Sequence, residues 1–135
     1  MTFAELKVDV VILACAVSAG IHGALVADHF QEEGVGAGVG FVVATVLLGV
    51  LAAALTRRPS QPVLLAAIAV LAGLIVSYAL VLATGLPVIH PDRESPDGLA
   101  LFTKAVEACG LAVAASLVGR PSRRPLLLQP KGTLT

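Results

Sequence analysis

The feature that most constrains this chain is a series of four long apolar runs, at about residues 8–30, 39–55, 63–84 and 99–118. An α-helix needs about 20 predominantly apolar residues to cross a hydrocarbon core that is roughly 30 Å thick. With 57% hydrophobic and 13% charged residues, the chain lacks the polar surface of a soluble domain of this size. We therefore predict an all-α fold, an integral membrane four-helix bundle.

The bundle leaves no room for a separate soluble domain. Residues 1–119 form the predicted membrane domain, and residues 120–135 are basic and interrupted by prolines. This composition is typical of a disordered tail. The segment Q-E-E-G-V-G-A-G, at residues 31–38, predicts a flexible turn between the first two spans.

Basic residues are distributed unevenly among the segments that connect the spans. They lie before the first span, in the second loop and in the tail, at Lys7, Arg57, Arg58, Arg120, Arg123, Arg124 and Lys131. The first loop has none, and the third has only Arg93. Because positively charged short loops stay in the cytoplasm, we predict a multi-pass plasma membrane protein with both termini inside.

The formal net charge of zero gives no basic footprint for nucleic acid. Cys15 and Cys109 fall within apolar runs, which favours packing over a disulfide framework. No serine or cysteine has a histidine at a spacing that indicates activation, so we assign no catalytic residues. The sequence favours a role other than catalysis.

Ionisable side chains inside a membrane cost about 2.5–3.5 kcal/mol each on insertion scales, so each needs a reason. His22, Lys104 and Glu107 lie within the spans, roughly 8–15 Å from their outer ends at about 1.5 Å per residue. Tyr78 falls in the same layer. Lys104 and Glu107 are spaced i,i+3 and can touch. We expect these residues to form an intramembrane polar cluster.

A second polar layer lies at the predicted outer mouth. His29, Glu32 and Glu33 close the first span at spacings by which one helical turn presents two ligands, and His90 and Asp92 lie in the third loop. Nitrogen and carboxylate ligands suit a divalent transition metal, namely zinc, copper(II), nickel or iron. Haem is disfavoured because only His22 lies well inside a span.

Each polar feature also has a purely structural interpretation, which the sequence leaves open. The mouth residues are ordinary at a water interface, the Lys104–Glu107 pair is consistent with a structural salt bridge, and His22 with a packed, hydrogen-bonded side chain. Proton transfer through the His22, Tyr78, Lys104 and Glu107 layer would need water from both sides. The apolar cytoplasmic halves of the spans argue against it.

The segment S-A-G-I-H-G-A-L-V-A-D-H-F is followed by acidic residues, a second span rich in small residues, R-R-P and G-L-P. It resembles small four-span membrane proteins of high-GC actinobacteria, over roughly Val8 to Val118. Their Ile-His near the outer third of the first helix, with a second histidine seven positions on, matches His22 and His29. The resemblance implies the four-span fold and marks these two histidines, and it implies no activity.

Two functional hypotheses follow. The first is a bundle in the lipid bilayer whose outward-facing cavity binds a divalent metal or another small ligand through His29 and His90, with help from carboxylates. The second is an accessory subunit of a larger respiratory or transport complex, or a homo-oligomer, because small residues such as those of Gly110-x-x-x-Ala114 let helices approach closely.

Overall fold

The computed structural model describes residues 2–84 and 97–118 and is entirely helical over that part of the chain. The helices are α1 (Phe3–Glu32), α2 (Val35–Arg57), α3 (Gln61–Thr84) and α4 (Gly98–Val118). Each of these four is long and apolar enough to cross a membrane. The four predicted apolar helices are therefore present, whereas the predicted tail, at residues 120–135, and most of the third loop lie outside the described residues.

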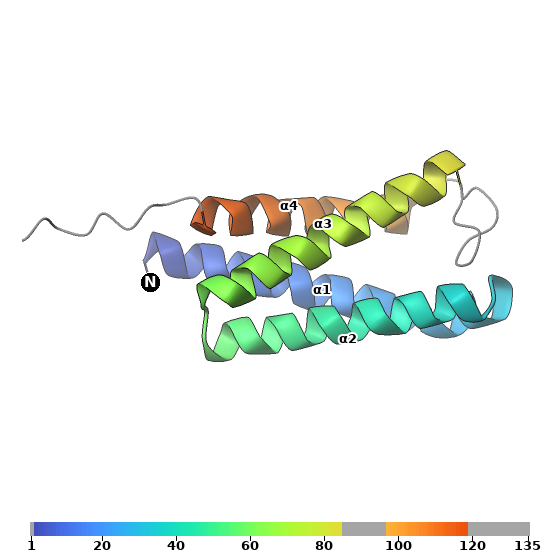
Figure 1. Ribbon diagram of the computed structural model, residues 1–135, viewed down its shortest axis with the longest axis horizontal. Coiled ribbons are helices and arrows are strands. Elements are labelled where there is room, and N and C mark those ends of the chain that lie inside the picture. The colour runs from blue at the N-terminus through green and yellow to red at the C-terminus, as the bar shows by residue number, and fades with distance from the viewer. Residues whose placement is uncertain (1, 85–96, 119–135) are drawn as a thin grey trace, which may run out of the picture.

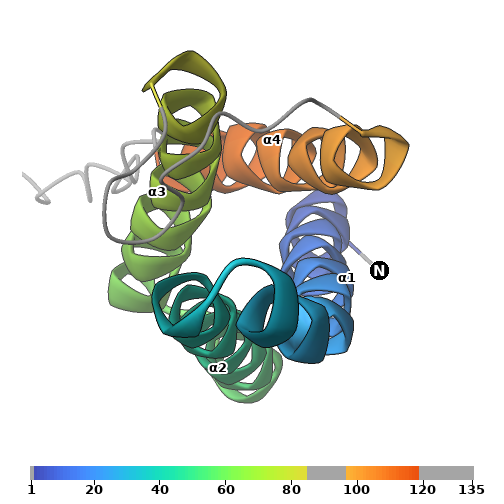
Figure 2. The same ribbon diagram turned by 90° about the vertical axis from the view of Figure 1, so that its right-hand side faces the viewer.

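The helices alternate in direction and form a ring in chain order (Figures 1 and 2). Each helix packs against its two neighbours in the ring, and α1 packs most extensively along α2. Helix α3 is visibly tilted in Figure 1 and is the least buried. We call the end where α1 joins α2 the His29 end, and the opposite end, where α1 begins, the Lys7 end.

Helix α1 begins five residues earlier than its apolar run, at Phe3 instead of Val8. A capping box explains the extension, because the Thr2 hydroxyl accepts from the Glu5 amide while the Glu5 side chain accepts from the Thr2 amide. The prediction counted only the apolar length of the span. The Thr-x-x-Glu pattern that starts the helix is readable in the sequence.

The glycine-rich segment after α1 is mostly helical, so the prediction of a flexible turn over residues 31–38 was wrong in extent. Only Gly34 has a positive φ, at 95°, and it caps the start of α2. Gly38 lies inside α2 against the ring of Phe30, and a Cβ there would lie 2.3 Å from the Phe30 Cγ. The glycine is needed for this close contact between the two helices.

Much of the outer surface of the bundle is apolar. Large hydrophobic side chains point outward from all four helices, among them Leu13, Val46, Val76 and Leu101. Hydroxyl groups on the helices donate to the carbonyl four residues earlier, as in the bonds from Thr45 to Phe41 and from Ser77 to Gly73. This pattern suits a lipid environment, where water does not satisfy polar groups.

Helices α1 and α4 meet along one antiparallel seam. Near the Lys7 end, Lys7 Nζ donates to Ser116 Oγ at 2.8 Å, and near the middle Ser18 Oγ donates to Glu107 Oε1 at 2.6 Å. Between these bonds Gly110 faces Ala14, where a Cβ on Gly110 would lie 2.6 Å from the Ala14 Cβ. Gly110 and Ala114 are both buried, so this small-residue pair serves packing within the bundle.

We expect Gly110→Ala to destabilise the bundle, because the new methyl group forces α1 and α4 apart and disturbs the bonds on either side. Gly49→Ala is the matched control, since nothing lies within 4 Å of a Cβ there. It should leave stability unchanged or raise it by about 0.5–1 kcal/mol through helix propensity. Thermal unfolding in detergent, followed by circular dichroism, measures both. Equal stability of the two variants would contradict the close seam.

Candidate functional site

The centre of the candidate site is the carboxylate of Glu107, which has no exposed surface. Its Oε1 accepts a hydrogen bond from Ser18 Oγ on α1 at 2.6 Å. Its Oε2 accepts one from Lys104 Nζ, one turn earlier on α4, at 2.7 Å. Both oxygens are therefore bonded, and the negative charge has an opposite charge beside it, as a buried carboxylate requires.

Lys104 connects this carboxylate to α3. Its ammonium group lies 3.5 Å from the backbone carbonyl of Leu74 and 5.5 Å from the centroid of the Tyr78 ring. A carbonyl oxygen and the face of an aromatic ring both attract a cation. The ammonium is thus held by a carboxylate, a carbonyl and a ring, and its environment includes residues from two helices.

His22 lies on the α1 side of the network and is nearly buried, with 7% of its surface exposed. Its Nδ1 lies 2.9 Å from the carbonyl oxygen of Ser18 and 3.3 Å from the Ser18 hydroxyl. A carbonyl oxygen can only accept a hydrogen bond, so Nδ1 carries the proton. In the neutral ring the lone pair is consequently on Nε2.

A cavity of about 410 Å³ lies between this network and the His29 end of the bundle, and we call the part beside the network its floor. Its floor includes His22 and Lys104, and its walls include the rings of Phe41 and Tyr78. Side chains of four acidic residues also line it, at Asp28, Glu32, Glu33 and Asp97. The volume is within the range of pockets that hold small molecules, and the few polar groups converge on one space.

His29 sits in the wall of the cavity with a fixed orientation. Its Nδ1 lies 2.9 Å from the carbonyl oxygen of Leu25, which again requires a proton on Nδ1. The ring stacks on Phe41 of α2 with the centroids 3.5 Å apart, and Nε2 lies 3.5 Å from Glu33 Oε1. His22 also contacts Phe41, at 5.1 Å between centroids. Phe41 therefore contacts both histidines.

The structure brings together two of the predicted groups and leaves a third undetermined. The predicted intramembrane polar cluster comes together, as the common depth of its members predicts. Each member belongs to the hydrogen-bond network or lies beside it, and the members are His22, Tyr78, Lys104 and Glu107. His29, Glu32 and Glu33 line one cavity. His90 and Asp92 lie outside the described residues. Among the residues that the structure describes, no three His, Cys, Asp or Glu side chains gather to hold a metal ion.

Three side chains of the site are not among the site residues that we assigned from the sequence. Ser18 bridges two helices, although a serine in an apolar run gives little warning of such a role. Asp28, which precedes His29 in the sequence, also lines the cavity. Asp97 caps α4, because its Oδ1 accepts from the Ala100 amide at 2.7 Å. This cap is recognisable from an aspartate placed just before a helix.

We expect removal of one member of the Lys104–Glu107 pair to be costly and removal of both to be mild. Lys104→Met leaves a buried charge without its counterion, a loss of about 3–5 kcal/mol for comparable buried pairs. Glu107→Leu likewise leaves the Lys104 ammonium without its counterion. The double variant removes both charges and should be more stable than either single variant. Unfolding in mixed detergent micelles measures the free energies, and additive losses would contradict the pairing.

Comparison with models of protein families, with curated proteins and with solved structures finds no match for this chain. We therefore infer the function from the cavity, its charges and the hydrogen-bond network beside it.

Proposed function

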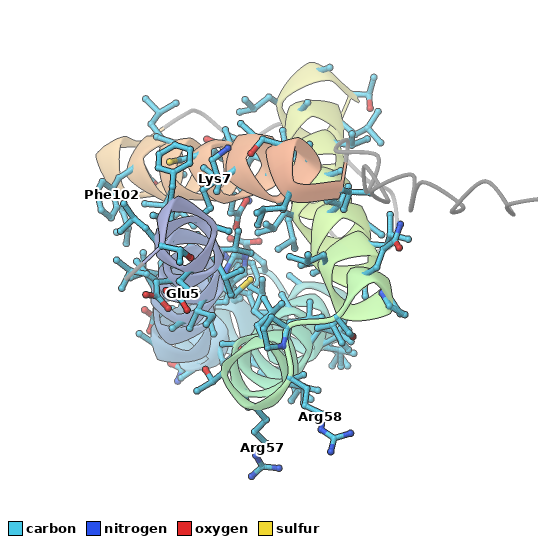
Figure 3. All side chains as sticks on the ribbon, turned by 90° about the vertical axis from the view of Figure 1, so that its left-hand side faces the viewer. Glu5, Lys7, Arg57, Arg58 and Phe102 are labelled. Carbon is cyan, nitrogen blue, oxygen red and sulfur yellow. The ribbon has the colours of Figure 1, made fainter. Side chains whose placement is uncertain are left out.

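We propose that this chain is a multi-pass plasma membrane protein with both termini in the cytoplasm. Support comes from the charge distribution: Lys7, Arg57 and Arg58 lie at the same end of the bundle (Figure 3). Within the described residues, Lys104 is the only basic side chain outside that end apart from the histidines, and it is paired with Glu107. Positively charged ends stay in the cytoplasm, so the cavity at the His29 end opens outward.

The ligand that we propose for this cavity is a small cation. Four carboxylates line the cavity, and the one ammonium group on its floor is neutralised by Glu107. The cavity therefore has an excess of negative charge, and a low-dielectric wall strengthens its field. A cation is attracted to such a site, while an anion is repelled. The rings of Phe41 and His29 give the cation an aromatic wall.

A divalent transition metal is the cation that the geometry favours first. Two ligand atoms bound to a tetrahedral zinc at about 2.0–2.1 Å lie roughly 3.3 Å apart. His29 Nε2 and Glu33 Oε1 are 3.5 Å apart, close to that separation. The bond from His29 Nδ1 to the Leu25 carbonyl also matches the arrangement that orients metal-binding histidines. This pair is the observation that carries the proposal.

The pair supplies two ligands, so a complete site needs more. Glu32 and Asp28 line the same cavity and are exposed to solvent, which allows their side chains to turn. We propose His90 and Asp92 as the remaining ligands, because the chain leaves α3 and enters α4 at the His29 end.

We expect detergent-purified protein to bind zinc or nickel, and His29→Ala to weaken binding by about tenfold or more through loss of a first ligand. The double variant with His90→Ala should retain almost none. Metal content by mass spectrometry and titration with zinc or nickel chloride measure both effects. His22→Gln is the matched control, because this histidine is buried and lies about 10.5 Å from His29 along α1, at 1.5 Å per residue. Negligible metal in all proteins would contradict metal binding.

The proposed orientation predicts the labelling of single cysteines in intact cells. Gln31→Cys and Gln61→Cys place a thiol on exposed positions at opposite ends of the bundle, in a background that has Cys109→Ala. A membrane-impermeant maleimide should label position 31 at once and position 61 only after permeabilisation. The reverse pattern would show that the cavity faces the cytoplasm, and equal labelling would contradict a single orientation.

A further inference from the structure

The hydrogen bonds around Glu107 have a consistent direction that leads from the cavity into the bundle. His22 lines the cavity, and its Nδ1–H donates to the Ser18 carbonyl oxygen at 2.9 Å, with the Ser18 hydroxyl oxygen 3.3 Å away as a second, longer acceptor. The Ser18 hydroxyl in turn donates to Glu107 Oε1 at 2.6 Å. We propose that His22 and Ser18 form a proton relay, and that Glu107 is a buried proton-binding site loaded from the cavity.

The transfer of one proton is balanced along this chain. A proton from water in the cavity binds the Nε2 lone pair of His22 as the Nδ1 proton moves to Ser18 Oγ. The hydroxyl proton of Ser18 moves to Glu107 Oε1. The products are a neutral histidine with its proton on Nε2, an intact serine and a neutral glutamic acid. Unloading reverses these steps: Glu107 returns its proton to Ser18 Oγ, the Ser18 hydroxyl proton returns to His22 Nδ1, and the Nε2 proton leaves to water in the cavity.

Loading Glu107 changes the charge at the floor of the cavity. The charged and titratable groups that face the carboxylate are His22 and the buried thiol of Cys15 on α1, Lys104 on its own helix and Tyr78 on α3. Helix α2 contributes no titratable side chain before Arg57. A neutral Glu107 no longer balances the Lys104 ammonium, so the floor gains a positive charge.

Within the described residues, no hydrogen bond leads from Glu107 toward the Lys7 end, so the relay ends at Glu107. The core side chains on that side are apolar, and they include Val11, Leu48, Leu55 and Leu71. A proton that reaches Glu107 must therefore leave by the route that it entered. The arrangement is suited to storing or sensing a proton on the cavity side and does not conduct protons across the bundle.

This inference does not depend on metal binding. Ser18 lies about 16 Å from His29 along α1, at 1.5 Å per residue, and Glu107 lies on another helix, α4. A protein that binds no metal would still contain the relay. Experiments on the relay can thus be done on the full-length chain with a metal chelator present.

Infrared difference spectra between neutral and acidic buffer identify the group that binds the proton. We expect a carbonyl-stretch band of a buried carboxylic acid in the wild-type protein, with a shift on exchange into heavy water. Glu107→Gln should remove this band, and Glu32→Gln, at the exposed mouth, should keep it. Should Glu107→Gln fail to fold, the Lys104→Met, Glu107→Leu double variant replaces it and must also lack the band.

A pH jump followed by time-resolved infrared measurement tests the route. Ser18→Ala removes the bridging hydroxyl and should slow the appearance of the band by about tenfold or more, because a positioned proton carrier is lost. Ser18→Cys keeps a proton-carrying side chain of similar size and should recover part of the rate. Ser77→Ala is the matched control, because Ser77 also lines the cavity and donates only to its own helix.

Two results would overturn the proposal. A carboxylic acid band that persists without Glu107 would assign the proton to another group. An unchanged rate in Ser18→Ala would show that protons reach Glu107 by a route that bypasses the relay. Circular dichroism and gel filtration of each variant restrict the comparison to folded protein.

Discussion

The carboxylate of Glu107 has no exposed surface, yet it lies in a bundle whose inside and outside are both apolar. Burial of an unpaired charge costs several kcal/mol, so this side chain must find hydrogen-bond donors and a counterion within reach. Lys104 supplies the counterion from the same helix, and Ser18 supplies a donor from α1. The ammonium group of Lys104 then extends the network to the backbone of α3. Three of the four helices are thereby fixed relative to one carboxylate.

Steric fit allows these bonds to form. Lipid tails are as apolar as leucine, so helices in a membrane associate chiefly through close packing and hydrogen bonds. Gly110 lets α4 approach Ala14 of α1, one turn from Glu107. Gly38 provides the same closeness between α2 and Phe30. The hydrogen bonds and the small residues therefore specify one register, since a shift along the seam would separate Ser18 from Glu107.

The two ends of the bundle differ in character, and this difference supports the functional proposals. The half near Lys7 is filled with buried aliphatic side chains, including Leu48, Leu55 and Leu71, and carries its charges on the surface. The half near His29 contains the cavity, its carboxylates and the polar network. A ligand has access to polar chemistry from one end only. Both proposals, cation binding and proton storage, use that end.

The sequence by itself determined the number and approximate limits of the helices. The length of an apolar run is a local property, and it decides whether a helix can cross the hydrocarbon core. It also predicted the Lys104–Glu107 contact, which follows from i,i+3 spacing on one helix. The metal ligands His90 and Asp92, the orientation and the accessory-subunit alternative stay predictions. Only the tertiary structure decided that Ser18 reaches Glu107, that Phe41 contacts both His22 and His29, and that Gly110 packs inside the bundle. These contacts join different helices, and the relative rotation and height of two helices depend on the packing of all their side chains together.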